Sequence, residues 1–145
     1  MKIDYAKNCD FESWISLLEL VKESFPGLDL GEYRNVLHQS ILNQEALIAK
    51  DDKGKLVGEL IFSRKNYELA FLAIHPSYRK KGIATNLIHH MFNLIPKGTK
   101  LKVITYRKGD VKGIAARKLY DSIGFTEGKL ITVFNYPCQE LNYVV

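Results

Sequence analysis

Residues 69–84 read Leu-Ala-Phe-Leu-Ala-Ile-His-Pro-Ser-Tyr-Arg-Lys-Lys-Gly-Ile-Ala, and they contain the clearest structural signal in the chain. The first six are apolar on both faces, which is typical of a central strand buried on both sides. A basic loop follows, and from about Gly82 to Ile95 apolar residues recur at helical spacing until Pro96 stops the helix. The stretch therefore predicts a buried strand that leads through a cationic loop directly into a helix.

The segments on either side extend this pattern into an α/β or α+β fold with a mixed central sheet. Helical spacing predicts a first helix capped by Asp10, and a second whose buried residues are Tyr33, Val36, Leu37 and Ile41. A further helix is expected from about residue 112 to 123, with Ala115 packed and Gly124 at its end. Apolar or alternating runs predict strands at 2–5, 46–50, 56–64, 67–74, 100–106, 130–134 and 139–144. No repeat or linker interrupts the chain, so one domain over residues 1–145 is expected.

Composition excludes several classes of protein. Of the 145 residues, 46% are hydrophobic and 26% charged, the balance of an ordinary globular domain. No apolar run approaches the roughly 20 residues of a membrane span, and residues 1–5 lack a signal-peptide pattern. Cys9 and Cys138 have no metal-ligand spacing, and His89 and His90 are adjacent rather than four apart. We therefore expect a cytoplasmic protein with no metal and no membrane association.

The positive charge is concentrated in one part of the chain. The net charge is +5, yet residues 79–118 hold eleven of the 21 lysines and arginines and a single acid, Asp110. The remaining residues carry more acidic than basic groups. Basic blocks of this kind meet nucleic acids, anionic membranes or phosphorylated ligands, or they form a solvated surface. Charge alone leaves these alternatives open.

The loop at residues 75–84 has the chemistry of an anion site. The first amide groups of a helix have no partner within it, and together with the helix dipole they attract negative charge. Gly82 lets the backbone approach a phosphate closely, and Arg79, Lys80 and Lys81 add positive charge at the same place. A diphosphate would suit this loop, although an ordinary basic surface turn uses the same residue types.

Two motifs resemble those of the GNAT superfamily of acetyl-CoA-dependent N-acyltransferases. Arg79-x-x-Gly82-x-Ala84 is similar to its Arg/Gln-x-x-Gly-x-Gly/Ala signature, and Leu119-Tyr120-Asp121-Ser122-Ile123-Gly124-Phe125 is similar to its Leu-Tyr-x-x-x-Gly-Phe segment. The order of strands and helices also agrees, so the resemblance covers nearly the whole chain. It implies a mixed, mostly antiparallel central sheet of six to seven strands with four helices, in which the fourth strand splays from the fifth.

The resemblance also implies an acetyl-CoA site along the fourth strand and the loop after it. The pantetheine arm and the thioester carbonyl would bind the backbone of Leu72, Ala73 and Ile74, where an amide would stabilise the oxyanion. Many members of the family have an asparagine at the position of Gly113, so Lys112 or backbone amides would replace that contact here. The pyrophosphate would bind the loop amides of Arg79, Lys80, Lys81, Gly82, Ile83 and Ala84.

The implied reaction is transfer of an acetyl group to a primary amine of a small molecule or protein by direct attack in a ternary complex. Tyr120 matches the family's general acid, and its phenol, with an ordinary pKa of about 10, would be protonated at neutral pH. Packing in the core is the alternative role for Tyr120. For the base, Glu68 at the start of the apolar strand is the first candidate, Glu59 on the neighbouring strand the second, and a water chain the third.

Two other functions compete with catalysis. One is a nucleic-acid-binding module that uses the basic block, although the sequence contains no helix-turn-helix, zinc knuckle or aromatic RNA-binding strand. The other is a catalytically silent sensor of acyl-CoA. The acidic remainder of the chain favours a cationic acceptor amine, no nucleic-acid partner is expected, and pairing through the last strands makes a homodimer an option.

Overall fold

The computed structural model describes every residue from Met1 to Val145 and has the predicted order of elements. Four short 3-10 helices accompany the regular elements, and two of them flank the candidate site, at Pro76–Tyr78 and Val111–Gly113. The strands and α-helices are β1 (Lys2–Tyr5), α1 (Phe11–Val21), α2 (Leu30–Leu42), β2 (Ala46–Lys50), β3 (Leu56–Ser63), β4 (Glu68–Ile74), α3 (Ile83–Asn93), β5 (Lys100–Tyr106), α4 (Ile114–Ile123), β6 (Thr126–Val133) and β7 (Tyr136–Val144).

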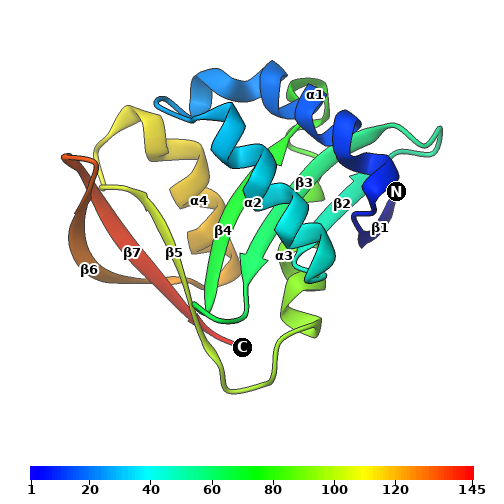
Figure 1. The fold of residues 1–145 in the computed structure, drawn as a ribbon. Coiled ribbons are helices and arrows are strands. Elements are labelled where there is room, and N and C mark those ends of the chain that lie inside the picture. The colour runs from blue at the N-terminus through cyan, green and yellow to red at the C-terminus, as the bar shows by residue number, and fades with distance from the viewer. The chain divides into compact units, whose positions relative to one another are not determined.

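The strands form a seven-stranded mixed sheet in the order β1-β2-β3-β4-β5-β7-β6, which confirms the predicted fold class (Figure 1). β1 with β2, β2 with β3, β5 with β7 and β6 with β7 are antiparallel pairs. The first residues of β4 pair in parallel with β5, with Glu68 opposite Lys102 and Leu69 opposite Val103. The splay between these two strands stays a prediction.

The chain is divided into two compact units. The first unit comprises Met1–Phe62 and Phe71–Leu94, and the second unit comprises Ser63–Ala70 and Ile95–Val145. The prediction of a single domain stays a prediction. None of the helices combines the length and apolarity that crossing a bilayer requires.

In the first unit, helices cover both faces of the strands. Ile48 lies opposite Glu59 across the β2–β3 pair, and their face packs against α1 and α2 through a buried cluster that includes Trp14. Gly58, the residue before Glu59 on β3, faces the other way, and a Cβ atom there would lie 3.0 Å from Ile83 at the start of α3. Because successive residues of a strand point to opposite faces, α3 covers the second face.

In the second unit, β5 and β7 pair over seven successive residues, from Lys100 opposite Val144 to Tyr106 opposite Cys138. Arg107 follows β5 and donates to the backbone carbonyls of Cys138 (3.0 Å) and Ile131 (3.0 Å), which belong to β7 and β6. One residue of the basic block therefore ties two strands together.

Three local predictions are not fully met. Asp10 is the N-cap residue of α1, as predicted, but its side chain makes no capping hydrogen bond, because its carboxylate accepts from the Lys7 amide (2.9 Å) and pairs with Lys50 Nζ (2.9 Å). Val36 on α2 and Ala115 on α4 are exposed, since the buried line of α2 runs through Tyr33, Leu37, Ser40 and Ile41, and only Tyr120 is buried on α4.

The last hairpin also differs from its prediction. Its turn is at Phe134-Asn135, both with positive φ (48° and 64°), and Pro137 lies inside β7 opposite Thr132. Two residues in the left-handed conformation match the twist of a tight hairpin. The turn was predicted at Tyr136-Pro137 because proline is a common turn residue. The β6 and β7 strands are consequently longer than predicted.

Candidate functional site

The predicted anion loop has an unusual backbone conformation. After β4, His75 Nδ1 accepts a hydrogen bond from the Ser77 amide (3.1 Å) at the start of the short Pro76–Tyr78 helix. Lys80 and Gly82 then adopt left-handed φ values of 61° and 80° before α3 begins. A lysine in this region is uncommon, and such strain persists where the surrounding structure requires the local path of the chain.

The start of α3 presents unpaired amide groups. The first hydrogen bond at this end runs from the Asn86 amide to the Gly82 carbonyl (3.0 Å), so the amides of residues 83–85 have no partner within the helix. No side chain caps this end, and a Cβ atom at Gly82 would meet nothing within 4 Å. An open, uncapped helix start beside Arg79, Lys80 and Lys81 fits the diphosphate of a nucleotide cofactor.

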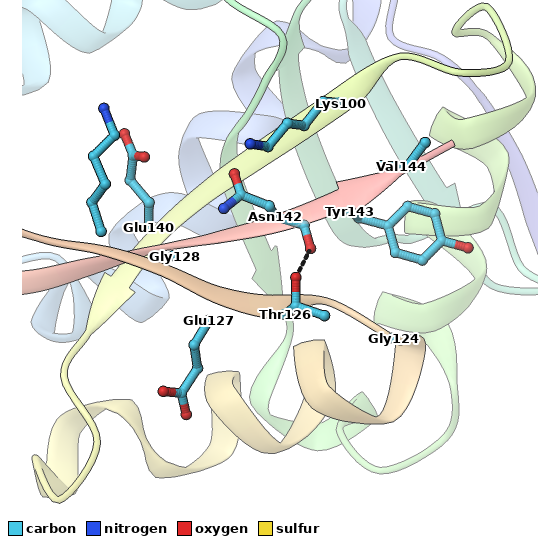
Figure 2. Close-up of a pocket in the computed structure, with 10 residues that line it drawn as sticks. Lys100, Gly124, Thr126, Glu127, Gly128, Glu140, Asn142, Tyr143 and Val144 are labelled. Atoms are coloured by element: carbon cyan, nitrogen blue, oxygen red, sulfur yellow. Dashed lines mark hydrogen bonds between the residues drawn. The ribbon is translucent and has the colours of Figure 1, made fainter.

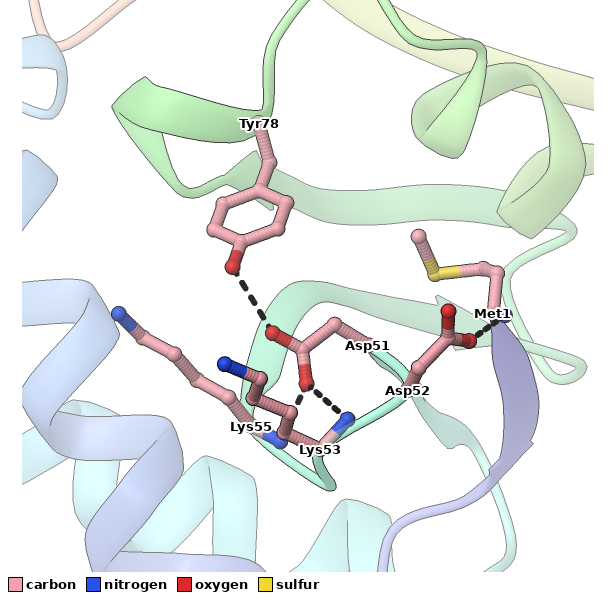
Figure 3. Close-up of polar contacts among 6 residues, drawn as sticks. All are labelled: Met1, Asp51, Asp52, Lys53, Lys55 and Tyr78. Atoms are coloured by element: carbon pink, nitrogen blue, oxygen red, sulfur yellow. Dashed lines mark hydrogen bonds and ion pairs between the residues drawn. The ribbon is translucent and has the colours of Figure 1, made fainter.

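A hairpin turn supports this loop from the side (Figure 3). The Tyr78 hydroxyl donates to Asp51 Oδ2 (2.8 Å), and Asp51 Oδ1 accepts from the amides of Lys53 and Lys55 (2.9 Å each). These hydrogen bonds, with that from Lys55 first, hold the pKa of Asp51 below its ordinary value. The β2–β3 turn and the anion loop are therefore tied together at Tyr78.

Cations surround Tyr78. The Nζ atoms of Lys55 and Lys81 lie 5.9 and 5.3 Å from the centre of its ring. Partial burial, and then the charges of Lys55 and Arg79, lower the pKa of His75. The neighbourhood of the loop is therefore positive, as an anion site requires, with contributions from two separate segments.

Leu72, Ala73 and Ile74 form the end of β4 in the first unit, directly before the loop. The His75 amide donates to the Val57 carbonyl (2.8 Å), which fixes this end of the strand against β3. Ala73 is buried, and Leu72 and Ile74 are half-buried. The binding of a thioester by the backbone of these residues stays a prediction.

Tyr120 lies on α4 in the second unit and is buried, with 6% of its surface exposed. Its ring contacts that of Phe125 (5.4 Å between centres), and its carbonyl accepts from the amides of Gly124 (3.1 Å) and Phe125 (3.0 Å). Burial raises the pKa of its phenol to about 12. The hydroxyl is therefore held in the protonated form that a general acid needs, and the ring also has the packing of a core residue.

Gly113, where many members of the family have an asparagine, is closely packed. Gly113 is buried, and a Cβ atom there would lie 2.8 Å from the Cβ atom of Tyr106, at the end of β5. The neighbouring Lys112 has its Nζ atom 4.9 Å from the ring centre of Tyr136, whose hydroxyl donates to Asp110 (2.6 Å). A residue larger than glycine would therefore be crowded at position 113, and Lys112 lies on an aromatic ring.

The two candidate bases have very different surroundings. Glu68 begins β4, is half-buried and lies opposite Lys102. Glu59 is wholly buried on β3, and neither carboxylate oxygen has a hydrogen-bond partner. Burial raises the pKa of Glu59 to about 9. Its place inside the apolar run Leu56–Phe62 was the sequence signal for this burial.

The predicted site residues are distributed over both units. The residues of the loop and the end of β4 are in the first unit, and Glu68, Lys112 and Tyr120 are in the second. Their assembly into one site stays a prediction. No three His, Cys, Asp or Glu side chains are grouped as metal ligands.

One groove in the second unit contains none of these residues (Figure 2). It has a volume of about 620 Å³, and Thr126 donates to the Asn142 carbonyl (3.4 Å) on its wall. Its lining includes Glu127, Gly128 and Lys129, where the β6–β7 pairing is irregular between Glu127 and Leu130. Sequence reasoning did not anticipate this groove, since no motif marks its residues.

Comparisons with known proteins agree on one family. The family model for the acetyltransferase (GNAT) domain matches residues 43–127. A GNAT family acetyltransferase from Bacillus cereus is similar in structure (TM-score 0.78, 19% identity, 99% of this chain and 96% of that chain covered). An N-acetyltransferase from Staphylococcus aureus is also similar (TM-score 0.75, 17% identity, 99% of this chain and 100% of that chain covered). The PaiA N-acetyltransferase from Thermoplasma acidophilum, solved in complex with coenzyme A, is similar as well (TM-score 0.70, 19% identity, 99% of this chain and 98% of that chain covered). No curated protein matches the sequence.

Proposed function

Since the chain belongs to the GNAT family of acetyltransferases, we propose that it transfers the acetyl group of acetyl-CoA to a primary amine of a small molecule or protein. The observation that carries this proposal is the open, uncapped start of α3 behind the left-handed loop residues Lys80 and Gly82. When bound, acetyl-CoA supplies an activated acetyl thioester. The protein then has to hold the thioester, present the amine and move two protons.

The residues toward the cofactor come from one continuous segment. The loop amides of residues 79–84 would hold the pyrophosphate, with Arg79, Lys80 and Lys81 neutralising its charge. The backbone of residues 72–74 would pair with the pantetheine arm, and an amide there would stabilise the developing oxyanion, an effect of about 3–4 kcal/mol in other enzymes. Lys112 would contribute positive charge from the β5–α4 connection.

Direct attack in a ternary complex needs a neutral amine and a protonated leaving group. Tyr120, whose pKa burial raises to about 12, would donate a proton to the departing thiolate. The amine would lose its proton to Glu68, to Glu59 or to water. A cationic acceptor, a homodimer and a cytoplasmic location stay predictions.

Acetyl-CoA binding measured by calorimetry, followed by thiol release with a panel of amines, tests the proposal. We expect the wild-type protein to bind acetyl-CoA and to release thiol in the presence of an acceptor. Tyr120→Phe should bind acetyl-CoA equally well and turn over at least about tenfold more slowly. Binding without any turnover would identify the acyl-CoA sensor, and salt-dependent duplex binding without acetyl-CoA binding would identify the nucleic-acid module.

A further inference from the structure

Two lysines from separate parts of the chain meet at the ring of Tyr78. Lys55 follows the β2–β3 turn and Lys81 belongs to the loop before α3, and their Nζ atoms lie 5.9 and 5.3 Å from the centre of the ring. Both side chains are exposed, and neither forms an ion pair. Two ammonium groups that share one ring without a counter-charge create a positive potential that attracts an anion from solution.

One carboxylate holds this lysine and the ring in place. Asp51 accepts from the Lys55 amide (2.9 Å) through Oδ1 and from the Tyr78 hydroxyl (2.8 Å) through Oδ2 (Figure 3). The amide of Lys53 donates to the same Oδ1 (2.9 Å), so both oxygens are engaged by neutral donors. The backbone of Lys55 is therefore fixed beside the loop before a ligand binds, and such preorganisation lowers the entropic cost of binding.

His75 lies in the same cluster. Its ring is 5.4 Å from the Tyr78 ring, centre to centre, and nearly perpendicular to it (87°). Its Nδ1 accepts from the Ser77 amide (3.1 Å), so the neutral ring carries its proton on Nε2. Partial burial, and then the charges of Lys55 and Arg79, lower the pKa of His75. Cations from two segments therefore act on one imidazole ring, which can report any anion that binds between them.

The loop alone does not balance the charge of the proposed cofactor. Acetyl-CoA carries about one negative charge on each phosphate of its diphosphate and about 1.5–2 more on its 3′-phosphate at neutral pH. Arg79, Lys80 and Lys81 and the unpaired amides of residues 83–85 suit the diphosphate. Lys55 is a further cation at this end of the site, and it comes from outside the loop motif.

We propose that Lys55 and Lys81, beside the Tyr78 ring, bind the 3′-phosphate of acetyl-CoA. The inference rests on the proposed acetyl transfer and gives the β2–β3 turn a role in selecting a cofactor that bears this phosphate. The two ammonium groups donate charge-assisted hydrogen bonds to the phosphate oxygens. Tyr78 directly precedes the loop residues assigned to the diphosphate, and the ribose separates the two phosphate groups by only a few bonds, so one molecule reaches both places.

Calorimetry with acetyl-CoA and its 3′-dephospho derivative tests the proposal. The wild-type protein should bind acetyl-CoA at least about tenfold more tightly than the derivative. Lys55→Met, which keeps the length of the side chain and removes its charge, should lose most of this preference by weakening only the binding of acetyl-CoA. Lys53→Met, in the same turn but without a contact to the Tyr78 ring, is the matched control and should keep the preference.

An NMR titration of His75 locates the phosphate. A dianion between Lys55 and Arg79 favours the imidazolium form, so saturation with adenosine 3′,5′-bisphosphate should raise the pKa of His75. Adenosine 5′-phosphate lacks the 3′-phosphate and should raise it less. If inorganic phosphate at the same concentration raises it as far as the bisphosphate does, the cluster is a general anion site and the proposal is wrong.

Two further results would overturn the proposal. One is equal affinity of the wild-type protein for acetyl-CoA and its 3′-dephospho derivative, which needs no variant and so does not depend on how a variant folds. The other is a Lys55→Met protein with the same preference as Lys53→Met. Failure to bind either cofactor form would instead overturn the proposed acetyl transfer, and a preserved preference without turnover would leave the phosphate site standing while that function fails.

Discussion

Replacing Glu59 by glutamine should change how the stability of the free protein depends on pH. The carboxyl group is wholly buried without a partner, and burial raises its pKa from 4.5 to about 9. Glutamine has nearly the same shape and no titrating proton. Glu59→Gln therefore removes one titration and leaves all others in place, so a comparison of variant and wild type isolates the contribution of this group.

The number of protons bound by the folded and the unfolded protein decides whether the free energy of unfolding rises or falls with pH. Between pH 4.5 and about 9 the folded protein keeps a proton on Glu59 that the unfolded chain has released. The contribution of this group is fully present below pH 4.5 and is lost as the pH rises through the folded pKa, by about 1.4 kcal/mol per pH unit. Between about pH 5.5 and about pH 7.5 the free energy of unfolding falls by about 3 kcal/mol on account of Glu59 alone, a large part of the roughly 5–15 kcal/mol of a typical domain.

Urea unfolding followed by the fluorescence of Trp14, the one tryptophan in the chain, measures the effect. Across this pH range the difference in unfolding free energy between Glu59→Gln and wild type should move in favour of the variant by about 3 kcal/mol. Glu127→Gln, at a side chain that is 59% exposed, serves as the control and should keep the wild-type slope. Parallel profiles for wild type and Glu59→Gln would refute the reasoning from burial.

Three further predictions concern the loop and its supports. Gly82→Ala, at φ 80°, should lose about 1–2 kcal/mol of stability and should also bind acetyl-CoA more weakly in calorimetry. The control Gly98→Ala, at φ 90° and equally uncrowded, should lose a similar amount of stability with no change in its affinity for acetyl-CoA. Tyr78→Phe removes a hydrogen bond to Asp51, so an NMR titration should find the pKa of that carboxyl group higher than in wild type; an unchanged value would contradict the contact. Gly113→Ala should destabilise the protein by about 1–3 kcal/mol in denaturant, since its Cβ atom would meet that of Tyr106, and a smaller loss in the Tyr106→Gly background would locate the cause.

The sequence predicted the order of elements because hydrophobic period is a local property. The strand Lys100–Tyr106 agrees residue for residue, and helix α2 was found from four apolar positions. Errors arose where a tertiary contact outweighs local preference. Asp10 was expected as a helix cap, but a lysine from a distant strand, Lys50, offers its carboxylate an ion pair that no local pattern reveals.

The candidate site was only partly predictable for the same reason. A loop motif such as Arg79-x-x-Gly82 is contiguous, so its chemistry can be recognised before the fold is known. Whether Glu59 has a hydrogen-bond partner depends on which side chains of α1 and α2 pack against it, and only the packed structure shows that none donates to its two oxygens. The apolar residues on both sides of Glu59 predicted a strand at residues 56–64, and neither its burial nor its lack of a partner was predicted.

The basic block illustrates how packing changes the meaning of charge. Arg107 holds β6 and β7 through two carbonyl groups, and Arg117 donates to the Tyr106 carbonyl (3.0 Å) and to Gln139 (3.0 Å). Lys112 lies over an aromatic ring. These contacts give Arg107, Arg117 and Lys112 structural roles within the protein, while hydrogen bonds to carbonyl oxygens leave the positive charge of the arginines in place. Arg79, Lys80 and Lys81 lie beside the unpaired amides at the start of α3, and a small phosphorylated cofactor matches the extent of that group better than a nucleic acid does.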